Sequence, residues 1–200
     1  MTIEKGMPWG SVQPAPHDVV IASDEASAAQ AIRNGARYVA LQSGDLLRAL
    51  GKGDGIGAAT LAGNCLVLPC DVFRVTLDEH TEVVAVSSVM VGSRWKPRWW
   101  MTSGGFLGDL NVAPRAHPND GLADALRFDD VTMRTLWAMR RRMRLGDHLP
   151  HPRLTMTRAA EVHWQSARSA PVWVDGKLHG RFRNVQLVVQ SDAFSLCVPQ

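Results

Sequence analysis

The chain has 200 residues, of which 46% are hydrophobic, so it can bury the core of one large domain or of a small and a larger one. A net charge of +3 fits an anionic partner without requiring one, while the lack of any run of ~18 apolar residues excludes a transmembrane helix and the apolar-poor start disfavours secretion. Three cysteines without a Cys-x-x-Cys pair favour a reducing compartment, the cytoplasm, over a disulfide framework or a zinc site.

The first part of the chain predicts a small α/β segment. Ser23 or Asp24 can cap a helix, and Gly35 can end it. Because this helix stands between two short hydrophobic strands, the strands should run parallel. The expected elements are an extended, proline-punctuated leader at 1–17, strands at 18–22 and 38–41, the helix at 25–34, and a loop that opens a second helix at 42–50.

A glycine-rich stretch at residues 51–63 is the candidate linker, so we divide the chain into a reduced α/β segment, residues 1–64, and a second domain, residues 65–200. The second part carries short hydrophobic runs separated by turns, which predicts an antiparallel β-sandwich crossed by one helix. Asp129 or Asp130 should cap that helix. The expected elements are strands at 65–68, 72–77, 82–91, 99–102, 107–112, 154–164, 171–175, 183–189 and 193–198, a hairpin turn at 78–80, and the helix at 129–145.

Two Asp-Gly elements lie about 55 residues apart in the second part of the chain. Residues 117–124 are His-Pro-Asn-Asp-Gly-Leu-Ala-Asp, and residues 171–177 are Pro-Val-Trp-Val-Asp-Gly-Lys. Between them come the predicted helix and Gly-Asp-His at 146–148, and Val-Pro follows at 198–199. This ordered series resembles the C-terminal half of the bacterial diacylglycerol and lipid kinase family. That family has Asn-Asp-Gly-x-x-Asp, a helix, Gly-x-His, Asp-Gly-Glu and a closing Val-Pro in the same order. The resemblance covers roughly residues 105–200 and weakens upstream.

The resemblance implies a structural Mg²⁺ ion in the Asn-Asp-Gly loop. In the family the Asp carboxylate and two nearby carbonyl groups are its ligands, which correspond here to the Asp120 carboxylate and the carbonyls of His117 and Leu122. A hard divalent cation prefers such an oxygen set. The alternative for the same segment is a plain Asx turn without a metal.

Asp175, Gly176 and Lys177 stand where the family has Asp-Gly-Glu, whose carboxylates lie near the acceptor hydroxyl. The resemblance therefore implies catalytic positions at Asp175 and Lys177. Lys177 departs from the pattern, because a cationic side chain cannot take up a proton as a Glu would. The alternative is a tight hairpin turn, for which Asp-Gly is a strong signal.

Ser43, Gly44 and Asp45 follow a hydrophobic strand and precede a helix, as the nucleotide motif Gly-Gly-Asp-Gly-Thr does in the family. The resemblance implies an ATP-binding loop here, because glycines and a helix N-terminus let backbone amides approach phosphates. Only Gly44 and Asp45 match, and the segment before the linker is short for a nucleotide-binding half. These departures count against ATP binding by this chain alone.

The predicted helix at 129–145 carries five arginines, and Trp95, Trp99 and Trp100 alternate with basic residues. A basic amphipathic helix can attract anionic headgroups, which predicts a lipid or membrane surface as partner and a peripheral location; the alternative is an ordinary solvated face. Interleaved aromatic and basic residues also occur on single-stranded nucleic-acid surfaces. No nucleic-acid motif accompanies them, so we expect no nucleic-acid partner.

Three functions follow. The favoured one is a degenerate lipid-kinase-like protein, a pseudoenzyme that binds a lipid, a small ligand or a partner. The second is an active kinase that transfers the ATP γ-phosphoryl group to a lipid hydroxyl with the help of Mg²⁺. The third is a kinase completed by another chain, as a homo-oligomer or with a partner protein.

Overall fold

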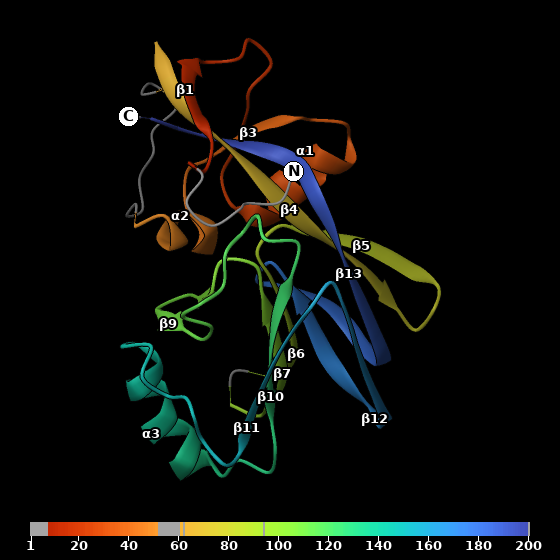
Figure 1. Ribbon diagram of the computed structural model, residues 1–200. Helices are drawn as coiled ribbons and strands as arrows, with labels where there is room; N and C mark the ends of the chain where they lie inside the picture. Colours follow the sequence, from red (N-terminus) through yellow and green to blue (C-terminus); the bar gives the residue numbers. More distant parts are fainter. Residues whose placement is uncertain (1–7, 52–60, 62, 94, 200) are drawn as a thin grey trace.

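The computed structural model describes residues 8–51, 61, 63–93 and 95–199. Within these residues one winding sheet runs through the molecule, with three helices set around it (Figure 1). The helices are α1 (Glu25–Arg33), α2 (Asp45–Ala49) and α3 (Met133–Met143). The strands are β1 (Ser11–Pro14), β2 (Val20–Ala22), β3 (Tyr38–Leu41), β4 (Asn64–Leu77), β5 (Thr81–Ala85), β6 (Ser88–Gly92), β7 (Pro97–Thr102), β8 (Phe106–Leu107), β9 (Leu110–Asn111), β10 (Ala123–Phe128), β11 (Leu154–Ala159), β12 (Glu161–Val174) and β13 (Lys177–Pro199).

Two long strands, β4 and β13, form the spine of the molecule. They pair antiparallel from Val185 opposite Leu77 to Pro199 opposite Cys65. At its start β13 also pairs with β12, and near its end it pairs in parallel with β3. The predicted division between residues 64 and 65 therefore falls at the beginning of a strand that belongs to both parts of the sheet.

The N-terminal unit has the predicted strand–helix–strand order. The strands β2 and β3 are parallel, as expected, and α1 connects them. Asp24 is the N-cap, since its carboxylate accepts the backbone N–H of Ser27 at 2.7 Å. The helices α1 and α2 pack against the N-terminal half of β4 and the C-terminal part of β13. The cluster that joins them includes Ala28, Leu46 and Leu196. Most of the predicted linker, residues 52–60 and 62, lies outside the described residues.

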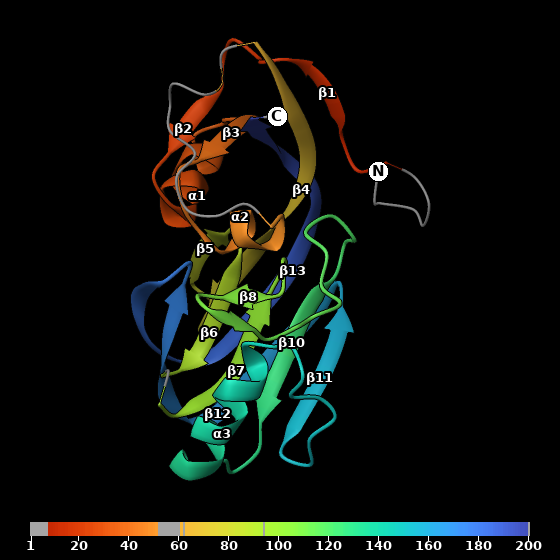
Figure 2. The same ribbon diagram turned by 90° about the vertical axis from the view of Figure 1, so that its left-hand side faces the viewer.

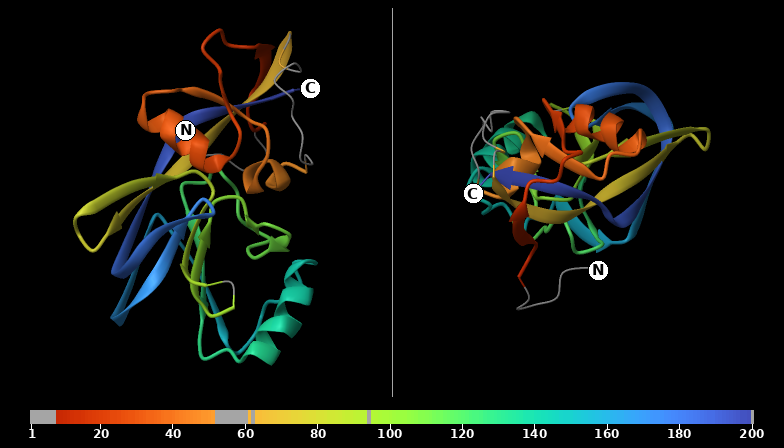
Figure 3. Two further views of the ribbon diagram at one scale, coloured as in Figure 1. Left: turned by 180° about the vertical axis from the view of Figure 1, so that it is seen from behind. Right: turned by 90° about the horizontal axis from the view of Figure 1, so that it is seen from above.

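The rest of the chain is the predicted antiparallel β-sandwich. Figure 2 shows β6, β7, β10 and β11 side by side below the N-terminal unit, and the left view of Figure 3 shows the long β4–β13 pair, in yellow and blue, to one side of this green layer. The core between the layers contains Phe73 of β4, Leu187 of β13, Val91 of β6 and Met101 of β7, all fully buried. Alternating apolar residues on facing strands bury this face.

Several sequence-based element predictions were wrong in detail. The predicted strands at 65–68 and 72–77 belong to one strand, β4, and those at 183–189 and 193–198 belong to one strand, β13, whereas residues 154–164 span two strands, β11 and β12. Residues 82–91 form two strands, β5 and β6, because the backbone N–H groups of Val86 and Ser87 turn away from the ladder and donate to Asp175. The helix α3 begins at Met133, not at residue 129, because Thr132 caps it: its hydroxyl accepts the Thr135 N–H at 3.2 Å. The strand β10 was not predicted at all.

Candidate functional site

Three carboxylates gather where the N-terminal unit meets the sandwich. Glu25 is the first residue of α1, Asp45 is the first residue of α2, and Asp175 lies in the turn between β12 and β13. Burial, with smaller contributions from the negative charges of Asp175 and Asp45, raises the pKa of Glu25 to about 7. Burial, with a contribution from Asp45, likewise raises the pKa of Asp175 to about 6. The junction is therefore strongly acidic, although no three His, Cys, Asp or Glu side chains of the described residues are grouped to hold a metal ion.

The predicted nucleotide loop is in direct contact with Glu25. The Glu25 carboxylate accepts the backbone N–H of Leu46 at 3.0 Å. Gly44 has a φ of +142°, and a Cβ there would lie 2.0 Å from a Glu25 carboxylate oxygen, so the carboxylate packs directly on the loop. Ser43 donates to the Ser23 carbonyl at 2.8 Å and is half-buried. An internal anion thus occupies the place where the sequence predicts a phosphate.

Asp175 has a clear structural role in the turn predicted from Asp-Gly. Asp175 and Gly176 both have positive φ, 45° and 76°, as the two-residue turn of a hairpin requires. The Asp175 carboxylate accepts three backbone N–H groups of the β5–β6 connection at 2.8, 2.9 and 3.0 Å. Lys177 is exposed at the start of β13. Its charge helps to lower the pKa of Asp24, after the larger effect of the hydrogen bonds from Ser27.

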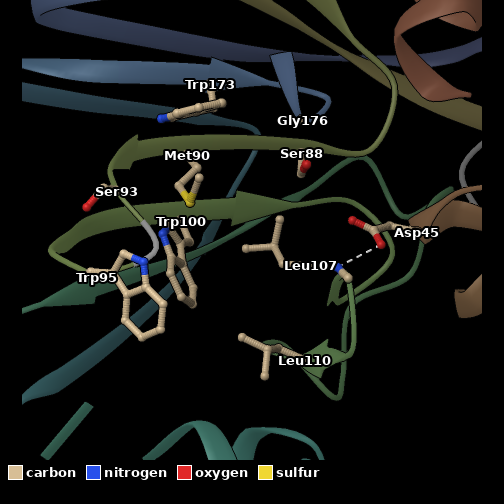
Figure 4. A pocket seen from close by; sticks show the side chains of 11 residues that line it. Asp45, Ser88, Met90, Ser93, Trp95, Trp100, Leu107, Leu110, Trp173 and Gly176 are labelled. Atoms are coloured by element: carbon tan, nitrogen blue, oxygen red, sulfur yellow. Dashed lines mark hydrogen bonds between the residues drawn. The ribbon is translucent and has the colours of Figure 1, made fainter. Parts of the chain in front are cut away.

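A pocket of about 400 Å³ opens beside the acidic junction (Figure 4). Asp45 stands at one end, where its carboxylate accepts the Gly108 N–H at 2.8 Å. The pairing of β12, β6 and β7 places Trp173, Met90 and Trp100 opposite one another in adjacent strands. The remaining walls are mostly apolar: the pocket is also lined by Ser88, Ser93, Trp95, Leu107, Leu110 and Gly176. We call it the tryptophan pocket.

Two indole N–H groups of this pocket are buried without a hydrogen-bond acceptor. Those of Trp100 and Trp173 have no partner among the described residues. Buried donors are rarely left unpaired, because an unmade hydrogen bond to a buried group costs about 1–3 kcal/mol. The pocket is therefore apolar in most of its walls, and these two N–H groups lie beneath its surface.

The Asn-Asp-Gly loop lies apart from the tryptophan pocket, since none of its residues lines that pocket. One oxygen of Asp120 accepts the N–H of Leu122 at 3.0 Å, and the other contacts the guanidinium of Arg158. The Arg158 Nε also lies 3.2 Å from the Asp124 carboxylate, which is almost fully buried. An Mg²⁺ ion at Asp120 would have to displace this guanidinium. The residues present do not fit the ion in this arrangement.

Asp71 of β4 positions the same loop and is a residue that sequence reasoning missed. Its carboxylate accepts the N–H of Gly121 at 2.7 Å, the side-chain amide of Asn119 at 3.3 Å and the N–H of Asp192 at 3.0 Å. Burial, the largest influence, raises its pKa. The only signal in the sequence is that Asp71 is a charged residue between two hydrophobic runs, 65–70 and 72–73. His117 accepts the Asn119 N–H at 3.1 Å. Among the described residues it belongs to no group of three His, Cys, Asp or Glu side chains that could hold a metal ion.

Comparison with known proteins places this geometry in a family. Residues 72–197 match the family model described as the YegS C-terminal NAD kinase beta sandwich-like domain. The chain belongs to this family. The YegS match covers the sandwich, from β4 onward, and confirms the resemblance that the Asp-Gly series indicated. No curated protein matches the sequence.

Solved structures show that the YegS-type fold extends over the N-terminal unit as well. A diacylglycerol kinase from Bacillus anthracis strain Sterne aligns at 13% identity over 90% of this chain and 76% of its own, with a TM-score of 0.59. Two further structures from the same organism align at 13% and 14% identity over 90% and 92% of this chain and 77% and 78% of theirs, with TM-scores of 0.62 and 0.64. At such identities the likeness concerns the fold.

Proposed function

We propose that this chain is a lipid-kinase-like protein that binds an uncharged glycerolipid, such as a diacylglycerol, in the tryptophan pocket without phosphorylating it. The observation that carries the proposal is the tryptophan pocket itself, a mostly apolar cavity that is lined by Trp95, Trp100 and Trp173 and opens beside the acidic junction. Ser88 and Ser93 add polar groups to the lining, which suits the hydroxyl and ester oxygens of a glycerolipid better than a pure hydrocarbon. The volume of about 400 Å³ lies within the range of small-molecule sites.

The acidic junction supports binding without phosphoryl transfer. A nucleotide triphosphate in the Ser43–Gly44–Asp45 loop would meet the Glu25 carboxylate on Gly44 and the Asp45 carboxylate beside it. A phosphate in contact with a carboxylate near a protein surface is repelled by roughly 4 kcal/mol. The amide of Leu46, which could bind a phosphate oxygen, already donates to Glu25.

The Asp-Gly-Lys turn also supports this proposal. The carboxylate of Asp175 accepts three backbone N–H groups, so taking up a proton would weaken three hydrogen bonds at once. Lys177, which stands in the position of the family's Glu, is exposed and carries a positive charge. Neither side chain is arranged as an efficient proton acceptor for a lipid hydroxyl.

An active kinase is the second candidate, favoured by two observations. Asp45 lines the tryptophan pocket, and the raised pKa of Asp175, about 6, lies near the working range of a general base. In such a kinase the lipid hydroxyl oxygen would attack the γ-phosphorus of ATP, the bond to ADP would break, and the hydroxyl proton would pass to Asp175.

The test is a titration with dioctanoylglycerol, followed by tryptophan fluorescence and by thermal denaturation. A ligand that binds only the folded state raises the apparent stability. We expect saturable binding by the wild type and weaker binding by Trp100→Phe, which replaces an indole that lines the pocket with a smaller ring. Trp164→Phe is the matched control, because Trp164 lines a different cavity and packs in the sandwich core. Equal binding by both variants contradicts the proposal.

Mg-ATP supplies the second arm of the experiment. We expect millimolar Mg-ATP to leave the denaturation temperature unchanged and labelled ATP to transfer no phosphate to dioctanoylglycerol. Transfer that is abolished by both Asp45→Ala and Asp175→Asn would establish the kinase and refute the binding-only function.

A further inference from the structure

The outer side of α3 combines arginines with exposed aromatic and apolar side chains. Its inner side packs against the sandwich through Leu136, Met139 and Met143. The opposite side faces solvent, and the turn between β6 and β7 extends it, with α3 beside these strands in Figure 1. We call this surface the arginine–tryptophan face; it consists of Met133, Arg134, Trp137, Arg140, Arg141 and Trp95.

Its aromatic side chains are unusually exposed. Trp137 is 62% exposed and Trp95 is 61% exposed. The guanidinium of Arg141 lies 5.4 Å from the Trp137 ring centroid, and that of Arg140 lies 5.5 Å from the Trp95 ring centroid. Large exposed apolar side chains rimmed by charge mark interaction sites more often than plain solvated surface.

The face is continuous with the tryptophan pocket. Trp95 belongs to both, since it lines the pocket while most of its own surface is exposed. Figure 4 shows Trp95 beside Trp100 at the end of the pocket opposite Asp45, with a helix passing below them. Trp100 in turn packs in the cluster that anchors α3. The helix, the exposed ring and the pocket therefore form one connected unit.

We propose that the arginine–tryptophan face docks on the surface of an anionic lipid bilayer and holds the mouth of the tryptophan pocket against it. Tryptophan prefers the membrane–water interface, and arginine binds headgroup phosphates. A basic amphipathic helix that lies in this interface gains from both. Among the described residues no helix is long and apolar enough to cross a membrane, so the contact is a surface contact. Delivery of lipid to the pocket rests on the proposed function; the docking itself does not.

A bilayer fits this face better than a nucleic acid does. Single-stranded nucleic acids are bound in grooves that track the backbone and stack successive bases. Here the arginines and Trp137 project from one helix, and Met133 adds an apolar side chain that is 51% exposed. Such a side chain gains from entering the acyl boundary and contributes nothing to phosphate recognition.

The test is co-sedimentation with vesicles of phosphatidylcholine alone or with 30 mol% phosphatidylglycerol. We expect binding to the anionic vesicles only, weakened by high salt. Each surface arginine contributes roughly fivefold, so Arg134→Gln with Arg141→Gln should weaken binding about 25-fold. Arg168→Gln with Arg183→Gln is the matched control, because it removes the same charge from exposed sites on β12 and β13. Trp137→Ala should also weaken binding, whereas Leu178→Ala, at a residue that is 56% exposed, should not.

The outcomes separate docking from the pocket. Weakened vesicle binding with intact binding of dioctanoylglycerol in the absence of vesicles supports docking by the face. Vesicle binding that is sensitive to these variants, in a protein that binds no dioctanoylglycerol, supports docking and refutes the proposed function. Docking is overturned if the wild type binds no anionic vesicle, if the control pair weakens binding equally, or if a single-stranded oligonucleotide is bound in preference to vesicles.

Discussion

The carboxylate of Glu25 accepts the backbone N–H of Leu46 at 3.0 Å, so a hydrogen bond joins the first turn of α1 to the first turn of α2. In a nucleotide-binding loop this amide would face a phosphate. Here the anion is part of the protein and is held in place by burial against Gly44. Because burial disfavours the charged form, Glu25 is held partly protonated near neutral pH, with a pKa raised to about 7.

This contact predicts an unusual pH dependence of stability. The pKa of Glu25 rises from 4.5 to about 7 on folding, so the folded state binds the proton more tightly. Its contribution to stability is therefore present below about pH 4.5 and is lost as the pH rises to about 7, by up to about 3 kcal/mol. Glu25→Gln, which keeps an acceptor oxygen, should be more stable than the wild type at pH 8 and should gain nothing at pH 4.5. Urea denaturation across this range measures the difference; parallel curves for the two proteins would contradict it.

Asp175→Ala should destabilise the protein by at least about 3 kcal/mol, because three backbone N–H groups would lose their acceptor. Asp175→Asn retains one acceptor oxygen and should lose about half as much. Equilibrium denaturation of both variants decides the point. Wild-type stability in the Ala variant would mean that the carboxylate is not a structural element and would leave it free for catalysis.

Removal of metal ions should leave the stability of the Asn-Asp-Gly loop unchanged, because Arg158 supplies the positive charge for Asp120 and Asp124. We expect the same denaturation temperature with EDTA and with millimolar Mg²⁺. An Mg²⁺-dependent rise of several degrees would establish the metal site that the family resemblance implies.

Arg158→Met tests the same ion pairs by removing the cation that Asp120 and Asp124 share. It should cost about 2 kcal/mol at pH 8, because it leaves the buried Asp124 carboxylate without its partner. Burial already raises the pKa of Asp124 to about 6, and the variant should raise it further. The loss should therefore shrink as the pH falls from 8 to about 6, because Asp124 takes up its proton at a higher pH in the variant than in the wild type. A loss that does not change with pH would assign the effect to packing alone.

Much of the scaffold could be predicted from the sequence because it depends on local patterns. The cap at Asp24, the parallel pair β2–β3 and the Asp-Gly turn at Asp175 each follow from residues within a few positions of one another. The Asp-Gly series identified the family for the same reason: its order and spacing are visible without the fold. The strand β10 escaped because Ala123–Phe128 is short and contains both Asp124 and Arg127.

The candidate site could not be predicted in the same way because its contacts are long-range. Glu25 and Leu46 are 21 positions apart, and Asp71 reaches Gly121 across 50. In the sequence Glu25 is indistinguishable from any acidic residue in the first turn of a helix, where such residues are common. The break between β5 and β6 likewise depends on Asp175, which lies far along the chain.

Gly44 and Glu25 should be energetically coupled, and this coupling tests how closely the internal anion packs on the loop. Gly44→Ala introduces a Cβ that would lie 2.0 Å from the Glu25 carboxylate, at a φ of +142° that side chains rarely adopt. We expect a loss of about 3 kcal/mol, of which about 1 kcal/mol is backbone strain. In a Glu25→Ala background the clash disappears and only the strain remains, so the double-mutant cycle should give a coupling of about 1–2 kcal/mol. Gly51→Ala, where a Cβ would meet no atom within 4 Å, is the control for positive φ alone. Additive losses would show that the Glu25 carboxylate does not rest on the loop, and phosphate access to Leu46 would then be open.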